Sequence, residues 1–595
     1  MQISPHSRST PKKHTFVRQK QTLAIALVSV VTILSVASYA GWATTAFSRQ
    51  SFIRQRHNPL CRTTHKQKII SSAISSSVRP SAAARTTSLF TRNYNAKRHP
   101  NFTTRQRQRI MSSMSLSNTN NHADTNNFAS YLNSVPATLS ERTKQHNADA
   151  PNDGGNDDNG PTIHMTMGNE AGDADSIISA LALGYVVQSQ ILSSDQNVDA
   201  DNSIQEIVVP IVSVPRTDLS LRRDVMLLLD LADITVENLL YVDDDIVSRN
   251  LLPSSYDKKS SQSDRSLPRT LTLVDHNRIR SSLSHLSTLV SEIVDHHVDE
   301  KSHQDVVTTD SGKRIIAFEN GQATVASTCT LVTERIFQHT ALGDQSATIS
   351  INGSLGLLLL GVILLDSVNM LAEAGKGTAR DEKAMQMLLH HTGWASYHET
   401  VRMPSLVDAT TLERIFPNGR SSMPDRTALF EVLSGAKNDP QFWSELSVMD
   451  CLRIDYKKFL VSGQSHLVSS IGLSSVLLDM DSLLSKENFL DDLTAFAALS
   501  DVGLFGIMAV NFRDGKPNRE LLLTGSNTEI VDSFTNYLLN HPDAAFLEIT
   551  ERKDCMDDGA YNAAPIRVFQ QGNGKGSRKQ VAPILLGHAA TMSRL

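Results

Sequence analysis

The segment TIHMTMGNEAGDADSIISALALGYVV, residues 162–187, indicates the fold class of this 595-residue chain. Its first six residues form a short β-rich run, which predicts a strand over residues 162–167. Asp175 and Ser176 mark the start of a helix that continues to Val187. A strand followed by a helix is the first half of a βαβ unit, so the segment predicts a parallel sheet.

The same alternation of short β-rich runs with longer helical stretches continues beyond this segment. Further strands are predicted over residues 206–214, 239–242, 271–274 and 292–294. Polar residues follow nearly every one of them. In an open parallel sheet the carboxyl ends of the strands converge on a crevice, so residues distant in sequence can share one site there.

Charge and composition divide the chain into two parts. Residues 1–123 contain 19 Lys and Arg but no Asp or Glu, which leaves 38 basic and 62 acidic residues, a net charge of −24, for the rest. Apolar residues make up 40% and aromatic residues 5% of the chain, which is typical of a soluble α/β protein and excludes a polytopic membrane protein or a collagen. The length allows three or four domains.

The N-terminal part has the features of a targeting sequence. An uncharged apolar run, residues 22–42, follows a basic segment, as in a secretory signal or a signal anchor, and is long enough to cross a bilayer. Residues 47–117 are rich in Arg, Ser and Thr, as in a transit peptide. Together they resemble the two-part plastid presequences of algae with secondary plastids, which implies a plastid protein. A membrane-anchored protein, a mitochondrial protein and a cytoplasmic protein translated from a downstream start are the alternatives.

A polar, Gly-rich stretch separates this part from the globular part. Residues 118–160 include NTNNHADTNN and DGGNDDNG, a composition that buries too little apolar surface to fold. We therefore predict that residues 1–159 comprise a targeting or anchor segment and a disordered linker. The four cysteines are scattered without CxxC spacing, so neither a disulfide framework nor a structural zinc site is predicted.

Four short polar motifs follow the apolar elements of the globular part. They are GNEAGDADS (168–176), LVDHN (273–277), IVDHH (293–297) and the aspartate that closes LGLLLLGVILLDS (355–367). Taken singly, each is more typical of a helix cap or a local hydrogen bond. Carboxylates with one or two imidazoles and no thiolate form a ligand set for Mn²⁺ or Mg²⁺. Two such ions close together favour in-line displacement at phosphorus, and thus hydrolysis of phosphoanhydrides or phosphoesters.

In this order the four motifs resemble motifs one to four of the DHH phosphoesterase superfamily, over about residues 162–595. GNE in the first motif is similar to the exopolyphosphatase and prune branch rather than to the family II inorganic pyrophosphatases. The resemblance implies an α/β fold: a parallel-sheet DHH domain that carries two divalent ions, Mn²⁺ or Mg²⁺, and a smaller mixed α/β C-terminal domain that closes over the cleft. The metal ligands that it implies are Asp173, Asp175, Asp275, His296 and Asp366, with Asn169 as a weak ligand. Asp275 would bridge the ions, and His297 would donate to a phosphoryl oxygen.

The C-terminal region resembles the second DHH-associated domain. CLRIDYKKF (451–459), RELLLTGS (519–526) and KGSRKQVAPIL (575–585) carry the likeness. Arg578 and Lys579 follow the Gly-rich stretch QGNGKG, whose backbone amides can approach an anion closely. An Arg fork and a Lys point charge suit phosphate, so both are predicted to bind substrate.

The predicted organisation is a DHH domain over residues 160–390, a connector over 391–427 and the second DHH-associated domain over 428–595. The predicted activity is an exopolyphosphatase that releases phosphate from inorganic polyphosphate. Alternatives are an inorganic pyrophosphatase, a prune-like cyclic-nucleotide phosphodiesterase and a prune-like interaction protein whose metal site is incidental. No nucleic acid partner is expected, because the basic segment lacks interleaved aromatics, and membrane contact is expected only through residues 22–42.

Overall fold

The computed structural model describes ten stretches of the chain: residues 127–148, 162–194, 206–253, 269–306, 313–341, 351–395, 402–461, 467–513, 516–554 and 565–592. The apolar run 22–42 and the basic stretch 47–117, on which the predictions of targeting depend, lie outside these residues. Among the described helices, the one long and apolar enough to span a membrane is Ala174–Ser193. It is the central helix of the first domain.

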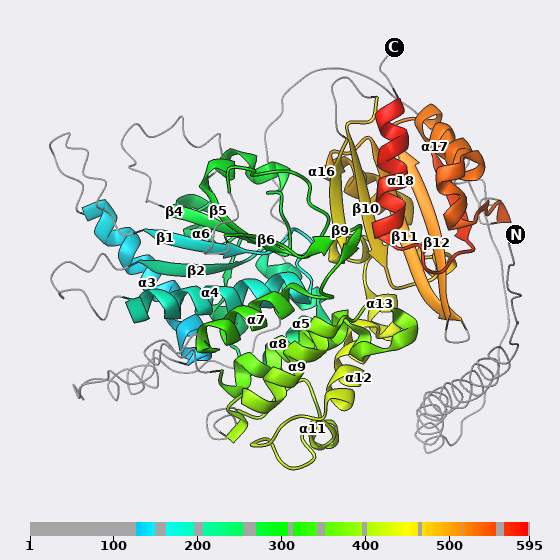
Figure 1. The fold of residues 1–595 in the computed structure, drawn as a ribbon. Coiled ribbons are helices and arrows are strands. Elements are labelled where there is room, and N and C mark those ends of the chain that lie inside the picture. The colour runs from blue at the N-terminus through cyan, green and yellow to red at the C-terminus, as the bar shows by residue number, and fades with distance from the viewer. Residues whose placement is uncertain are drawn as a thin grey trace, which may run out of the picture. The chain divides into compact units, whose positions relative to one another are not determined.

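The first domain is built on a six-stranded sheet (Figure 1). Its strands lie in the order β3-β2-β1-β4-β5-β6, and every pairing is parallel. Their bounds are β1 Ile163–Met167, β2 Ile207–Val212, β3 Leu240–Tyr241, β4 Arg269–Val274, β5 Val290–Asp295 and β6 Arg314–Ile316. The predicted parallel sheet is thus confirmed, and each of the five predicted strands has a counterpart in it.

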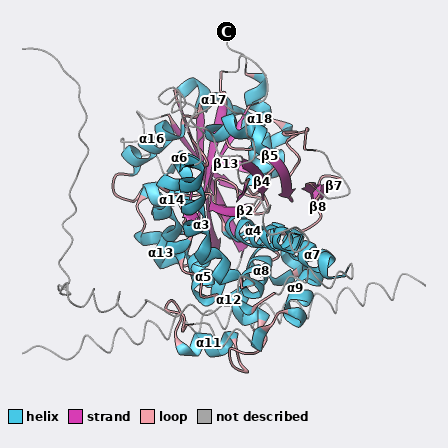
Figure 2. Cartoon of the chain, turned by 90° about the vertical axis from the view of Figure 1, so that its left-hand side faces the viewer, coloured by secondary structure: helices cyan, strands magenta, loops and turns pink. Residues whose placement is uncertain are grey.

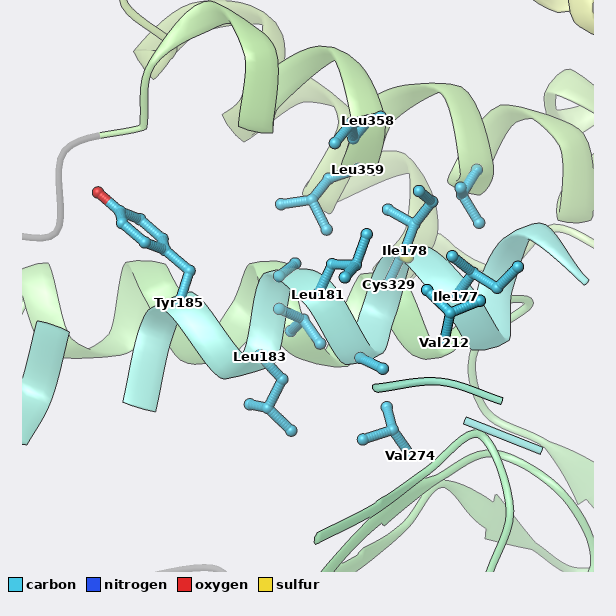
Figure 3. Packing of buried hydrophobic residues seen from close by; sticks show 14 of the residues in the cluster. Ile177, Ile178, Leu181, Leu183, Tyr185, Val212, Val274, Cys329, Leu358 and Leu359 are labelled. Carbon is cyan, nitrogen blue, oxygen red and sulfur yellow. The ribbon is translucent and has the colours of Figure 1, made fainter. Parts of the chain in front are cut away.

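A layer of helices covers one face of this sheet. Helix α4 (Ala174–Ser194) packs on β1 and β2 and also contacts α7 (Thr328–Ala341) and α8 (Gly353–Asp366). Figure 3 shows Leu181 of α4 on the side that faces Leu359 of α8. Helix α8 is apolar on all sides because α4, α7, α5 (Arg223–Leu231) and α9 (Ala379–His391) surround it.

Part of the predicted linker is folded, which corrects the expectation for residues 118–160. Phe128–Ala148 form helix α3, which packs on α4 and β2. Phe128 and Leu139 are fully buried, and the Tyr131 hydroxyl donates to the Val208 carbonyl oxygen at 2.9 Å. Polar flanks dominate the average composition of the linker and conceal this short apolar stripe.

The predicted connector also belongs to the first domain. Helices α11 (Ala409–Ile415) and α12 (Arg426–Lys437) bury Leu412, Leu429 and Leu433 in the first-domain core. Because α12 packs on α5 and α8, the first domain continues to about Lys437, beyond the predicted boundary at residue 428.

The second domain is a mixed sheet between two layers of helices. In Figure 2 its strands lie between α16 (Phe489–Ser500) on one side and α17 (Thr528–Asn540) and α18 (Arg578–Thr591) on the other. Its strands lie in the order β13-β14-β12-β11-β10-β9. Their bounds are β9 Tyr456–Leu460, β10 Ser470–Val476, β11 Leu504–Arg513, β12 Lys516–Gly525, β13 Ile549–Glu551 and β14 Ile566–Gln571. The strands β10 and β11 are parallel, and the other pairs are antiparallel.

Side chains of β11 point alternately to the two faces of the sheet, and so contribute to both hydrophobic clusters of the second domain. Leu504 and Met508 face the cluster formed with α17 and α18. Phe505 and Ile507 face the cluster formed with α14 (Val448–Ile454) and α16. This period of two is that of a strand buried on both faces.

Candidate metal centre

The first motif forms the turn between β1 and α4. At Gly168 a Cβ atom would lie 2.4 Å from the Ser176 carbonyl oxygen, so only glycine allows the chain to pass the helix start so closely. The Asp173 carboxylate accepts from the Ser176 backbone N–H at 3.1 Å, and thereby caps α4. Asp175 lies one residue into the helix and is buried.

Asp175 is held by the start of helix α7. Ser327 Oγ donates to its Oδ1 at 2.6 Å, the Thr328 N–H donates to its Oδ2 at 2.7 Å, and the Cys329 N–H donates to Oδ1 at 3.0 Å. Three hydrogen bonds to one buried carboxylate fix its orientation.

Asp275, directly after β4, occupies the middle of the centre and is buried. Its Oδ2 accepts from Asn169 Nδ2 at 2.8 Å and from Ser176 Oγ at 2.6 Å. Its backbone has a left-handed φ of 62°, a conformation that non-glycine residues adopt rarely and at functional sites more often. Its Oδ1 lies 3.4 Å from His296 Nε2 and 3.5 Å from His297 Nδ1.

The third motif presents its two imidazoles differently. His296 Nδ1 donates to the Val325 carbonyl oxygen at 3.1 Å, which leaves Nε2 directed at Asp275 and, at 3.8 Å, at Asp175 Oδ2. This is how proteins orient an imidazole ligand. His297 is partly exposed, and its Nδ1 donates to Asp295 Oδ1 at 2.9 Å. Asn277 Nδ2 donates to Asp295 Oδ2 at 2.6 Å, so Asp295 supports His297 from behind.

The family models match both domains. A model described as the DHH family, N-terminal domain, matches residues 164–362, and a DHHA2 domain model matches residues 433–587. The chain therefore contains a DHH-family N-terminal domain followed by a DHHA2 domain. The curated relatives include human exopolyphosphatase PRUNE1, 26% identical over 424 residues that cover 71% of this chain and 75% of that protein. A putative exopolyphosphatase of Schizosaccharomyces pombe is 26% identical over 437 residues, covering 72% of this chain and 91% of that protein.

Two solved structures align with this chain at low sequence identity. A putative family II inorganic pyrophosphatase of Methanococcus jannaschii has 16% sequence identity and a TM-score of 0.42, and covers 72% of this chain and 99% of its own. An exopolyphosphatase-related protein of Bacteroides fragilis has 12% sequence identity and a TM-score of 0.27. This match covers 76% of this chain and 96% of the Bacteroides chain.

The donor set of the DHH domain fits divalent cations. The ligand atoms of Asp275, His296 and His297 lie within 4.8 Å of one another. Asp366 ends helix α8, and its buried Oδ2 has no hydrogen-bond partner in the structure. Burial raises the pKa of Asp366 to about 7, and Asp173 and Asp275 add to this effect, whereas Lys437 opposes it.

The charge balance around Asp175 leads to the same conclusion. Burial raises the pKa of Asp175 well above its usual value, and the carboxylates of Asp275 and Asp366 raise it further. Buried carboxylates that repel one another destabilise the folded protein unless a cation lies among them. The centre therefore has the orphaned acceptor and the excess of negative charge that divalent ions require.

Asn169 differs from its predicted role as a weak metal ligand. Its Oδ1 accepts from the Ala171 N–H at 2.9 Å, and its Nδ2 faces Asp275. The amide oxygen is thus engaged within its own turn. Asn169 is placed as a hydrogen-bond donor that holds Asp275.

The DHHA2 residues predicted to bind substrate are placed unequally. Arg578 donates to Asp455 Oδ1 at 2.7 Å and to the Asp455 carbonyl oxygen at 2.8 Å, so its guanidinium is already held by its own domain. Lys579 is exposed. The charge of Lys579 nevertheless acts on the metal centre. Burial lowers the pKa of His296, but Asp275 and Asp175 outweigh burial and raise this pKa to about 10, and the positive charge of Lys579 opposes the rise.

Sequence reasoning missed Lys457, in the DYKKF segment of the DHHA2 domain. Burial opposes the ionisation of Asp275, but the two histidines and, more weakly, Lys457 lower its pKa. Lys457 therefore lies within electrostatic reach of the centre. A lysine in a half-buried strand carries no local sequence signal that separates it from an ordinary surface lysine.

The DHHA2 domain contacts the first motif directly. The Lys458 N–H donates to Glu170 Oε1 at 2.9 Å. The buried Arg222 donates to the Gly172 carbonyl oxygen at 2.6 Å and to the Ile454 carbonyl oxygen at 3.0 Å. One guanidinium thus joins the turn that precedes Asp173 to the second domain.

Proposed function

We propose that this DHH protein is a metal-dependent exopolyphosphatase that releases phosphate from inorganic polyphosphate. The observation that carries the proposal is the convergence of Asp175, Asp275 and His296, from three segments of the chain, around a space with excess negative charge. The printed names of the human and fission yeast relatives, both exopolyphosphatases, support the same activity.

The residues that would hold two ions, Mn²⁺ or Mg²⁺, are Asp173, Asp175, Asp275, His296 and Asp366. The buried carboxylates favour hard cations. His296 Nε2 is directed at the carboxylates of Asp175 and Asp275. When bound, such ions neutralise phosphate charge and polarise the reacting groups.

His297 is suited to donate to the phosphate that is attacked. Its Nδ1 is fixed by Asp295, so Nε2 is the ring nitrogen that remains for a substrate. A donor that is already oriented stabilises charge as it develops on a phosphoryl oxygen. The Asp295–Asn277 pair keeps this orientation without contact with the substrate.

Arg578, Lys579 and Lys457 supply positive charge from the DHHA2 domain. The chain outside residues 1–123 has a net charge of −24, so attraction of a polyanion must be local to the centre. Bound between the domains, a phosphate chain would be shielded from water.

Phosphate release from pyrophosphate, tripolyphosphate and long-chain polyphosphate tests this proposal. The purified protein is assayed with Mn²⁺ and, separately, with Mg²⁺. We expect release from the longer chains in preference to pyrophosphate. Activity on pyrophosphate alone would assign an inorganic pyrophosphatase. A parallel assay with a cyclic nucleotide follows formation of the nucleoside monophosphate by chromatography, because this cleavage releases no phosphate, and activity there alone would assign a phosphodiesterase. No activity on any of these substrates would favour the interaction role.

Arg578→Ala tests the contribution of the DHHA2 domain. We expect KM for tripolyphosphate to rise about 10-fold with a smaller change in kcat, because a charge-assisted hydrogen bond to a bound phosphate is made in the ground state. Steady-state kinetics at saturating Mn²⁺ measures both constants. Arg567→Ala is the matched control, since Arg567 pairs with Asp532 at 2.6 Å in the same domain. An unchanged KM for Arg578→Ala would remove this residue from the substrate site.

A further inference from the structure

We infer that Asp381, which touches none of the expected metal ligands, is a positioning residue for the centre. It fixes the segment 325–330, and that segment in turn holds Asp175, Asp275 and His296. The inference rests on the proposed metal-dependent function.

Asp381 lies in the first turn of α9 and is fully buried. Together with Thr378 it forms a capping box, in which its Oδ2 accepts from the Thr378 N–H at 2.8 Å. The carboxylate also accepts from the Ala326 N–H, at 2.9 Å and 3.0 Å to its two oxygens, and from Thr330 Oγ1 at 2.6 Å.

These last contacts exceed what a helix cap requires. A capping box satisfies the N–H groups of its own helix start, whereas Ala326 and Thr330 belong to a segment some fifty residues earlier in the chain. Asp381 therefore ties the beginning of α9 to the beginning of α7. The neighbouring Arg380 reinforces this link, because its Nη1 donates to Thr324 Oγ1 at 2.9 Å and its Nε donates to Glu334 Oε1 at 2.9 Å.

The segment that Asp381 fixes contacts three of the expected ligands. The Val325 carbonyl oxygen accepts from His296 Nδ1 at 3.1 Å. Ser327 Oγ and the N–H groups of Thr328 and Cys329 hold both oxygens of Asp175.

Thr328 completes the set, since its Oγ1 donates to Asp275 Oδ1 at 3.3 Å. A shift of this segment would move the carbonyl that fixes the His296 tautomer and the donors that aim the two carboxylates. Groups that orient ligands in this way typically contribute about 10–100-fold to metal affinity.

Asp381→Ala, with Thr378→Ala as the matched control, tests the inference. Thr378→Ala removes the hydroxyl that accepts from the Arg380 and Asp381 N–H groups and so weakens the same helix start, but it leaves the carboxylate bound to Ala326 and Thr330. Calorimetric titration of the full chain with Mn²⁺ measures metal affinity. We expect Asp381→Ala to weaken Mn²⁺ binding about 10–100-fold, whereas Thr378→Ala stays within about two-fold of the parent, even where both lower the melting temperature.

A second readout separates positioning from general damage. If the ligands are only misaligned, phosphate release by Asp381→Ala recovers as Mn²⁺ is raised, with KM for tripolyphosphate unchanged. Equal Mn²⁺ affinity in Asp381→Ala and Thr378→Ala would overturn the inference. If the parent protein binds no Mn²⁺, the proposed function fails, and the inference fails with it.

Thr330→Val keeps the inference falsifiable if Asp381→Ala does not fold. This substitution preserves volume and removes only the 2.6 Å hydrogen bond to Asp381. We expect Mn²⁺ binding to weaken several-fold in a protein that remains folded. Mn²⁺ affinity equal to that of the parent would contradict the role assigned to Asp381.

Discussion

Asp275→Asn is expected to lower kcat by on the order of 10³-fold while the protein stays folded. The side chain keeps its shape, and one oxygen can still accept from Asn169 Nδ2 and Ser176 Oγ, which now lie 2.8 Å and 2.6 Å from Oδ2. The amide must then turn its NH₂ group toward His296 and the expected cations. The substitution thus removes the negative charge at the middle of the centre and replaces an acceptor by a donor.

Phosphate release at saturating Mn²⁺ and tripolyphosphate measures this effect. Asp408→Asn is the matched control, because Asp408 caps helix α11 by accepting from the Thr411 N–H at 2.7 Å and is exposed. The control should turn over as the parent does, and circular dichroism should show both variants folded. Near-normal turnover in Asp275→Asn would contradict its assignment as the central ligand.

Asp366→Asn is expected to abolish measurable activity and yet to raise the melting temperature of the metal-free protein. The buried Oδ2 of Asp366 has no hydrogen-bond partner, and the carboxylates of Asp173, Asp175 and Asp275 lie close enough to repel it. An uncharged amide relieves this repulsion. The same substitution removes an expected metal ligand, so we expect stability and activity to change in opposite directions, as they do at sites kept strained for function.

Thermal unfolding with and without Mn²⁺ checks this prediction. A ligand that binds only the folded state stabilises it by about 2.7 kcal/mol at a concentration 100 times its dissociation constant. Mn²⁺ should therefore raise the melting temperature of the parent and have much less effect on Asp366→Asn. A metal-free variant that melts below the parent would show that Asp366 is a structural carboxylate.

The parallel sheet and the residues that converge on it could be predicted because both follow from local patterns. Short β-rich runs that alternate with helices specify a parallel sheet, and the carboxyl ends of such strands meet. Asp275 follows β4 directly, and His296 follows β5. Asp366 was placed by its position at the end of an apolar run, which is a helix in the structure.

The groups that support the centre could not be predicted from the sequence. Ser327 and Thr328 stand at the start of a helix, where such residues are ordinary caps, and their contacts with Asp175 depend on how α7 packs against α4. Asp381 likewise has the pattern of a capping box. The ion pair between Arg578 and Asp455 joins residues more than a hundred positions apart, so no local pattern reveals it.

Helix α3 was missed for a different reason. Its buried residues Phe128, Leu132, Val135 and Leu139 recur at helical spacing, but they stand between polar stretches that dominate the composition of residues 118–160. Only periodicity within a window of about 12 residues detects such a helix.

We expect Asp175, Asp275, His296 and Asp366 to hold divalent cations together. A crystal of the protein grown with Mn²⁺, with anomalous data collected at the manganese edge, tests this expectation. Two anomalous peaks should appear, about 3.5–4 Å apart, with oxygen atoms of these aspartates and His296 Nε2 at about 2.1 Å. The absence of anomalous density among these side chains, or manganese bound only elsewhere on the protein, would contradict it.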